Sequence, residues 1–222
     1  MNDDRITLIT ADQFLQELVA TLYMAGVALT IGSVLGLLLG TTVVLTRRGG
    51  ILPNRPVYLV VNTAVNLVRS LPFIILLVAI LPFTRLLAGT SIGTTAAIVP
   101  LTIMIAPFIG RLVENSLLEV PAGVIEAARS MGATPWQIFI RFLLPEARGS
   151  LILALTTASI GLIDATAMAG TVGAGGIGDL AISYGYQRFD GVAMLVTVIT
   201  LIVIVQLVQW LGNSLARRVR RR

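Results

Sequence analysis

The stretch that decides the fold is VAMLVTVITLIVIVQLVQWL, residues 192–211, which contains no charged side chain. The hydrocarbon core of a bilayer is about 30 Å thick, and an α-helix of about 20 apolar residues crosses it. The length of this run and its lack of charge therefore predict a transmembrane helix.

The composition of the whole chain points to the same class of protein. Of the 222 residues, 56% are hydrophobic and 12% are charged, whereas soluble domains average roughly 25% charged residues. We expect an all-α fold, a polytopic membrane helix bundle in which residues 1–222 form one transmembrane domain. Five transmembrane helices are predicted, at about 18–45, 57–82, 94–113, 150–168 and 192–211, with a cytoplasmic loop at 114–149.

Several kinds of chemistry are excluded by missing residue types. The chain has no cysteine and no histidine, and all sixteen basic residues are arginine. Histidine-based catalysis and most transition-metal sites are therefore excluded, and we expect no catalytic residue, metal or cofactor. Because a P-loop needs a lysine, any ATP that drives this protein must bind to another subunit. The positive charge flanks apolar spans, so we expect contact with membrane lipid and no nucleic-acid binding.

The arginines also predict the orientation. With the N-terminus outside, twelve arginines fall on the inner side and three fall outside, namely Arg5, Arg85 and Arg188. Cytoplasmic loops of membrane proteins carry an excess of arginine and lysine. We therefore expect the N-terminus outside and the C-terminus in the cytoplasm.

The polar segment 114–149 predicts two short helices in its middle. Pro121 suits the first turn of a helix over about 121–131, and Gly132 suits the position just after its end. Thr134 and Pro135 predict the cap and first residue of a second helix. Four apolar residues fall at helical spacing on the first helix: Val124, Ala127, Ala128 and Met131. Such a helix is expected to dock on a partner, or alternatively to lie on the membrane surface.

The same segment carries a motif that resembles a known family. Glu126-Ala127-Ala128 is followed at fixed spacing by Gly132, Phe142 and Leu144-Pro145. This pattern is similar to the EAA signature of type I ABC importer permeases, with phenylalanine at 142 where that family usually has isoleucine. Four further segments look like the methionine importer permeases in particular: 66–73, 89–93, 97–101 and 172–178.

The resemblance implies a function, a set of partners and a location in the bacterial cytoplasmic (inner) membrane. Such a permease is a homodimer that works with two copies of an ATP-binding subunit and an extracytoplasmic substrate-binding lipoprotein. Its EAA helix is the coupling helix that enters a groove on the ATPase. Here the coupling residues would be Glu126, Ala127, Ala128, Met131, Gly132, Ala133 and Pro135. The substrate would be methionine or D-methionine, with another amino acid or small polar solute as the alternative.

Two charges, Arg69 and Asp164, are predicted to lie well inside spans. Intramembrane charges are costly and mark functional sites by default. Asp164 could meet a substrate ammonium in the pathway or pair with a neighbouring helix. Arg69 could bond to carbonyl groups freed around Pro72, and Met168 is the third pathway candidate. A proton-coupled secondary transporter is a weaker alternative, because we find no internal repeat and two isolated charges make a poor relay.

Two glycine patterns have structural interpretations. Gly173, Gly175 and Gly178 match G-x-G-x-x-G, but they follow a membrane span rather than a strand, so we expect a tight re-entry of the backbone instead of a dinucleotide site. The second pattern spaces glycines by four residues, at positions 32, 36 and 40. Such a face allows close helix packing, either within one chain or across a dimer.

Overall fold

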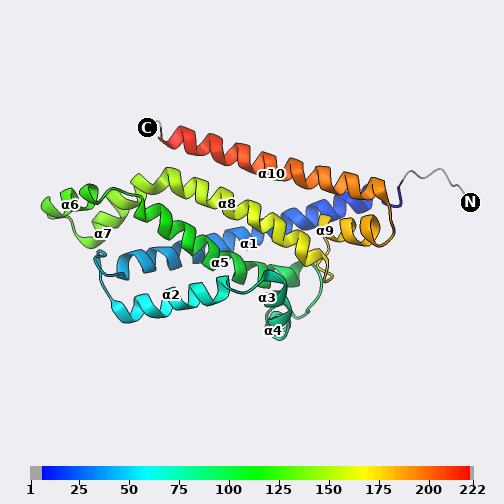
Figure 1. The fold of residues 1–222 in the computed structure, drawn as a ribbon, viewed down its shortest axis with the longest axis horizontal. Coiled ribbons are helices and arrows are strands. Elements are labelled where there is room, and N and C mark those ends of the chain that lie inside the picture. The colour runs from blue at the N-terminus through cyan, green and yellow to red at the C-terminus, as the bar shows by residue number, and fades with distance from the viewer. Residues whose placement is uncertain (1–6, 221–222) are drawn as a thin grey trace, which may run out of the picture. The chain divides into compact units, whose positions relative to one another are not determined.

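The computed structural model describes residues 7–220, and over that range every regular element is helical (Figure 1). The elements in chain order are α1 Ala11–Thr46, α2 Arg55–Arg69, α3 Phe73–Ala79, α4 Leu81–Ala88, α5 Thr94–Leu118, α6 Ala122–Ser130, α7 Pro135–Gln137, the π-helical η1 Ile138–Leu143, α8 Leu144–Gly170, α9 Ile177–Leu180, the π-helical η2 Ala181–Tyr186 and α10 Gly191–Arg220. The predicted all-α class is confirmed. Arg5, Arg221 and Arg222, which entered the orientation argument, lie outside the described residues.

Among the described residues, four continuous helical segments are long and apolar enough to cross a membrane, and a bent pair makes a possible fifth span. The bent pair is α2 with α3, which meet at an angle of 103°. The predicted span 57–82 is therefore not one straight helix. Pro72 explains the break, because it lacks an N–H and disfavours helical backbone at the preceding residue. Part of the predicted loop 83–93 is instead helical, as α4.

The predicted cytoplasmic loop 114–149 is also more helical than expected. Helix α5 continues to Leu118, and from Pro135 the helical backbone runs through η1 into α8. The polar residues that suggested a loop, among them Arg141, Glu146 and Arg148, are exposed on this helix. A helix that extends beyond the hydrocarbon can carry charge, so polarity marked the end of the apolar span and not the end of the helix.

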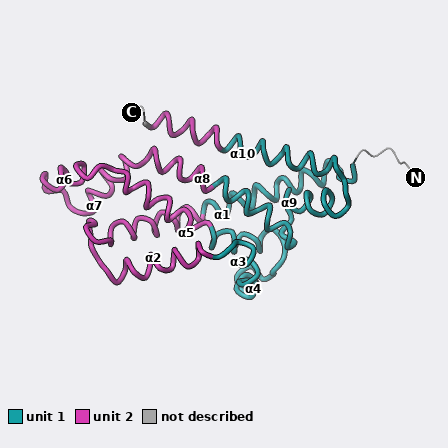
Figure 2. The backbone as a smooth tube through the Cα atoms, viewed as in Figure 1, with its two compact units in different colours: residues 1–30, 71–104, 159–208 teal, residues 31–70, 105–158, 209–222 magenta. Residues whose placement is uncertain are grey.

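The chain divides into two compact units (Figure 2). Unit 1 comprises Met1–Thr30, Leu71–Met104 and Ser159–Val208, and unit 2 comprises Ile31–Ser70, Ile105–Ala158 and Gln209–Arg222. Thirteen of the sixteen arginines belong to unit 2 and three to unit 1, whereas seven of the eleven acidic residues belong to unit 1. The positive charge is therefore concentrated on the segments that were predicted to face the cytoplasm.

Unit 2 contains the close helix packing that the spaced glycines predicted. A Cβ atom on Gly36 would lie 2.6 Å from the Ile109 side chain and 2.8 Å from the Ala106 carbonyl oxygen, both on α5. Gly32 and Gly40 likewise face α5. The glycine face of α1 therefore packs within the chain, which answers the question that the sequence left open.

Unit 1 contains the predicted tight reversal of the backbone after α8. Gly173, Gly175 and Gly176 have φ angles of 83°, 76° and 89°, in the left-handed region that favours glycine. Gly178 then lies directly against the backbone of Ala167 on α8, where no Cβ would fit. Helix α8, not a strand, precedes these glycines, so the dinucleotide motif lacks its structural context.

The α1–α5 packing can be tested with a matched pair of substitutions on one helix. Gly36→Ala should lower the free energy of unfolding by about 1–3 kcal/mol, because the new methyl group meets backbone that cannot move freely. Gly26→Ala is the control, since nothing lies within 4 Å of a Cβ built there. Thermal unfolding of the two purified variants in detergent measures the difference. Equal melting temperatures would contradict the packing described here.

Candidate coupling surface and pathway residues

Helix α6 has the end that its sequence predicted. Gly132 has a φ of 74°, its N–H donates to the Arg129 carbonyl at 2.9 Å, and the Ala133 N–H donates to the Ala128 carbonyl at 3.1 Å. These two bonds form the Schellman motif, in which a left-handed residue satisfies the last carbonyl groups of a helix. The prediction of Gly132 as the residue after the helix end is confirmed.

The next helix begins with a complete capping box. The Gln137 N–H donates to Thr134 Oγ1 at 3.4 Å, and the Thr134 N–H donates to Gln137 Oε1 at 2.9 Å. Pro135 occupies the first turn, as predicted. The backbone groups at the end of α6 and at the start of α7 are therefore hydrogen-bonded. Because of these bonds, the turn fixes the direction of α6 relative to α7.

The predicted apolar face of α6 is partly buried against its own chain and partly exposed. Ala128 is fully buried and Val124 is half-buried, whereas Ala127 and Met131 are exposed. The Arg129 guanidinium also donates to the Gly50 carbonyl at 3.3 Å, which ties α6 to the turn between α1 and α2. One side of α6 is therefore held by its own chain.

Large apolar side chains next to α6, on its C-cap residue and on α7, are exposed to solvent. Met131 is 68% exposed and Trp136 is 65% exposed. Glu126, Ala127 and Pro135 are also exposed, and Ala133 is half-buried. Sequence analysis did not single out Trp136, although an aromatic residue directly after the Thr134-Pro135 cap was a visible signal. A turn with exposed methionine and tryptophan is suited to a protein partner.

Two pathway candidates share one exposed stripe of α8. Asp164 and Met168 are exposed. Gly161 belongs to the same stripe, because it is exposed and a Cβ built there would have no atom within 4 Å. Asp164 makes no ion pair or hydrogen bond with another residue of the described chain. Among residues 7–220, the alternative of an ion pair between Asp164 and a neighbouring helix is therefore not found.

Arg69 lies at the end of α2, immediately before the bend. Its side chain is exposed and makes no hydrogen bond with the described residues. The bonds to carbonyl groups near Pro72 that the sequence suggested are not present. The bend instead uses backbone and hydroxyl bonds, in which the Ser70 N–H and the Ser70 hydroxyl both donate to the Leu67 carbonyl.

A polar cluster in unit 2 escaped the sequence analysis. Arg111 forms an ion pair with Glu114 and donates to the side-chain oxygens of Asn62 at 2.9 Å and Asn66 at 2.6 Å. Because α5 continues to Leu118, Arg111 and Glu114 both lie on this helix, near its C-terminal end. The sequence did contain a sign of this cluster. Two polar residues are spaced by four on α2 (Asn62 and Asn66) and two by three on α5 (Arg111 and Glu114), so each pair lies on one face of its helix. The cluster ties α2 to α5.

Two acidic residues of unit 1 also have roles that the sequence analysis did not assign. The Glu17 carboxylate accepts from the Gly176 N–H, and the Thr21 hydroxyl accepts from the Ile177 N–H at 2.8 Å. Together they satisfy the first backbone donors of α9. Asp190 accepts from the Leu8 N–H at 2.6 Å and from the Ala193 N–H at 2.9 Å.

Hydrogen bonding sets the protonation of Asp190. The backbone bond from Leu8 is the largest cause and the bond from Ala193 follows, and together they hold the pKa of the Asp190 carboxyl below its usual value. A lowered pKa stabilises the fold above the ordinary aspartate pKa, and this contribution is lost as the pH falls through the folded value. The contact is therefore fully present at neutral pH.

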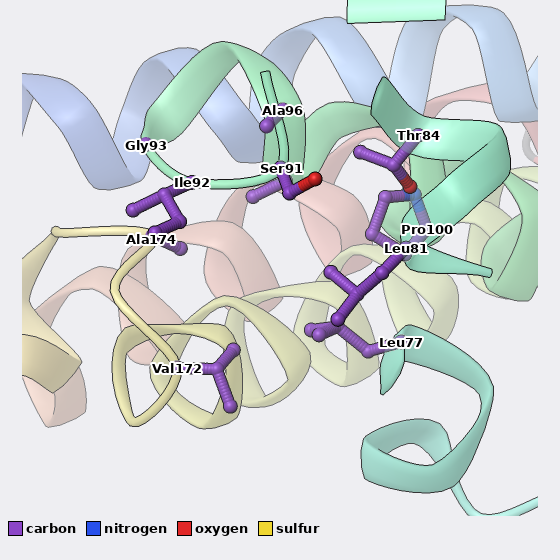
Figure 3. Close-up of a pocket in the computed structure, with 11 residues that line it drawn as sticks. Leu77, Leu81, Thr84, Ser91, Ile92, Gly93, Ala96, Pro100, Val172 and Ala174 are labelled. Carbon is purple, nitrogen blue, oxygen red and sulfur yellow. The ribbon is translucent and has the colours of Figure 1, made fainter. Parts of the chain in front are cut away.

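Figure 3 shows a small pocket in unit 1 between α4, α5 and the turn after α8. Most of its lining is apolar, including Leu77, Leu81, Pro100 and Val172, and the Thr84 hydroxyl is buried beside it with no protein partner among the described residues. The cavity volume is about 20 Å³, which is room for about one water molecule. The pocket is too small for an amino acid, so it is not the substrate site in this conformation.

The fold and the exposed turn define a multi-pass membrane protein with a surface suited to a partner. Comparison with known families places the chain specifically: it belongs to the family of binding-protein-dependent transport system inner membrane components, whose model matches residues 32–221.

Individual relatives agree with the family assignment. The chain is 50% identical over 211 residues to a probable D-methionine transport system permease protein, MetI, of Vibrio cholerae, covering 95% of this chain and 94% of the relative. It is 53% identical over 150 residues to the D-methionine transport system permease protein MetI of Escherichia coli K12, covering 68% and 69%.

Solved structures match the fold. A structure of the MetNI methionine ABC transporter in an inward-facing conformation matches with a TM-score of 0.92 and 46% identity, covering 94% of this chain and 97% of that one. A crystal structure of an amino acid ABC transporter with histidines matches with a TM-score of 0.77 at 22% identity, and supports the fold alone.

The geometry of α6 leads to a paired test. Gly132→Ala should destabilise the end of α6 by about 1–2 kcal/mol, because a residue with a Cβ is strained at positive φ. Gly123→Ala on the same helix should be neutral or stabilising, since Gly123 has no close neighbour and ordinary helical backbone. Hydrogen exchange of residues 122–134 in the assembled transporter measures both. Equal exchange in the two variants would contradict the assigned role of Gly132.

Proposed function

We propose that this chain is the permease subunit of an ATP-driven methionine importer. It works as a homodimer with two ATP-binding subunits and an extracytoplasmic substrate-binding lipoprotein. The observation that carries the proposal is the match to a methionine ABC transporter over 94% of the chain at 46% identity. The substrate named for the curated relatives, D-methionine, supports the same choice.

The division of labour follows from the sequence. With no lysine, the chain has no P-loop and hydrolyses no ATP itself. The exposed side of α6, together with Met131 at its end and Trp136 on α7, is the docking surface for the ATP-binding subunit. Its acidic residue Glu126 and the neighbouring Ala127 are exposed on the same helix.

The end of α6 and the start of α7 transmit the movement that ATP binding and hydrolysis cause in the ATP-binding subunit. A displacement of α6 reaches Gly132 and the capped turn at Thr134, whose backbone groups are already satisfied and resist fraying. The backbone then continues without a loop from Pro135 to Gly170. ATP-driven motion at α6 is therefore delivered along the same helical segment that carries Asp164.

The exposed stripe of α8 contributes to the pathway. The Asp164 carboxylate is suited to meet a substrate ammonium group, because it has no partner within the described chain. Met168 offers a flexible thioether that adapts to apolar side chains. Arg69, exposed beside the bend in α2, is a further pathway candidate that could meet a substrate carboxylate.

Uptake by the reconstituted complex tests the proposed function. Proteoliposomes that contain the permease, the ATP-binding subunit and the binding protein should accumulate labelled methionine only when ATP is supplied on the cytoplasmic face. Competition with D-methionine, L-methionine and other amino acids ranks the substrates. Uptake driven by a proton gradient without ATP would favour the secondary transporter instead.

The role of Asp164 has its own test. Asp164→Asn should reduce ATP-driven uptake at least tenfold and leave the yield of assembled complex within about twofold of the wild type, because no described residue pairs with the exposed carboxylate and would lose its partner. Asp12→Asn makes the same change of charge at another exposed acid, on α1, and should transport normally. Loss of assembly together with uptake would instead indicate a structural ion pair with the second copy.

We also propose that the N-terminus lies outside and the C-terminus in the cytoplasm, because this orientation puts twelve arginines on the inner side and three outside. The chain has no native cysteine, so single cysteines report the side directly. An impermeant maleimide added to intact cells that lack the outer-membrane barrier should label Gln187→Cys and not Leu52→Cys. The reverse pattern would overturn the orientation.

A further inference from the structure

A second site is suggested by a hollow at the turn between α1 and α2. It is lined by residues from the end of one span and the start of the next: Thr46, Arg47, Arg48, Pro53, Asn54, Arg55, Tyr58 and Leu59. Its cavity volume is about 560 Å³, within the range of the small-molecule sites of proteins. All of these residues belong to unit 2.

One end of the hollow carries concentrated positive charge. Arg47, Arg48 and Arg55 are all exposed, and none of them makes an ion pair with another described residue. Their guanidinium groups are therefore available to an anion. Arginine binds phosphate and carboxylate oxygens with two parallel hydrogen bonds, so three arginines around one hollow are suited to an anionic group with several oxygens, such as a phosphate.

The other end of the hollow is apolar. Tyr58 and Leu59 line it one turn into α2, and Leu59 is 50% exposed. The same helix exposes Val60 by 71%. Helix α2 is the first part of the bent candidate span, and tyrosine rings are enriched at the ends of spans in membrane proteins.

We propose that this hollow binds an anionic phospholipid, with the phosphate group at the arginines and the upper acyl chains against Tyr58 and Leu59. Charge and apolar surface occur in the order that such a lipid presents them from the headgroup inwards. Basic pockets between spans on the cytoplasmic side are suited to anionic headgroups. Free phosphate would use only the arginines, and an acidic partner protein would not need the exposed apolar turn of α2.

Lipid titration of the purified transporter tests the site. The assembled complex of permease and ATP-binding subunits is titrated with phosphatidylglycerol and with phosphatidylcholine, and bound lipid is counted by native mass spectrometry. Arg48→Gln with Arg55→Gln should weaken phosphatidylglycerol binding about 30-fold, at about 1 kcal/mol for each arginine, and leave phosphatidylcholine binding unchanged. Each single variant should bind phosphatidylglycerol about fivefold more weakly than the wild type. The single variants therefore still test the site if the double variant is unstable.

The matched control removes two arginines elsewhere in unit 2. Arg217→Gln with Arg218→Gln makes the same change of charge near the C-terminus, where both side chains are exposed, and should retain wild-type phosphatidylglycerol binding. If both double variants lose the same amount of phosphatidylglycerol binding, the effect comes from general surface charge, and the proposal is overturned. Wild-type binding in both, or complete displacement of the lipid by millimolar inorganic phosphate, would also overturn it. Loss of the ATP-binding subunit with unchanged lipid binding would assign the arginines to that partner instead.

Discussion

The rest of the structure depends on the constraint that hydrocarbon offers no hydrogen-bond partner to a peptide group. Backbone N–H and C=O groups inside a bilayer must be satisfied by the protein itself, and helices do this within one segment. Each place where a helix stops inside the bilayer therefore needs a specific solution, and Glu17 with Thr21 supplies acceptors to α9 across the turn after α8. Helix ends in the polar segment 114–149 are satisfied locally: the Schellman motif at Gly132 closes α6 and the capping box at Thr134 opens α7.

These solutions also connect structure with function. The turn at residues 131–134 is defined at both ends, so α6 is a rigid projection and not a mobile loop. Its inner side is buried through Ala128, while Met131 and Trp136 are left for a partner. The same principle operates in unit 2, where the Arg111 cluster and the glycine face of α1 join α2 and α1 to α5. In the proposed function, movement of α6 would be passed to these packed helices.

Much of this could be predicted from the sequence because the deciding signals are local. Apolar runs predicted the helical class, and Gly132, Thr134 and Pro135 predicted the ends around the coupling helix. Long-range pairings were not predictable: Glu17 lies far in sequence from the backbone donor of Gly176, and Arg111 is distant from Asn62 and Asn66. The bend at Pro72 was missed because proline inside an apolar run is tolerated in many membrane helices, and the extent of α5 and α8 was missed because polarity was taken as the end of a helix.

The central claim is that the ATP-binding subunit docks on the exposed side of α6. Because the chain contains no cysteine, a single cysteine at Met131 reports that surface, and one at Leu52, which is also exposed, serves as the reference. The rate of maleimide labelling is measured in inside-out vesicles with and without the ATP-binding subunit. The account predicts that the subunit slows labelling of Met131→Cys at least tenfold and leaves Leu52→Cys unchanged, whereas equal rates at position 131 in both preparations would contradict it.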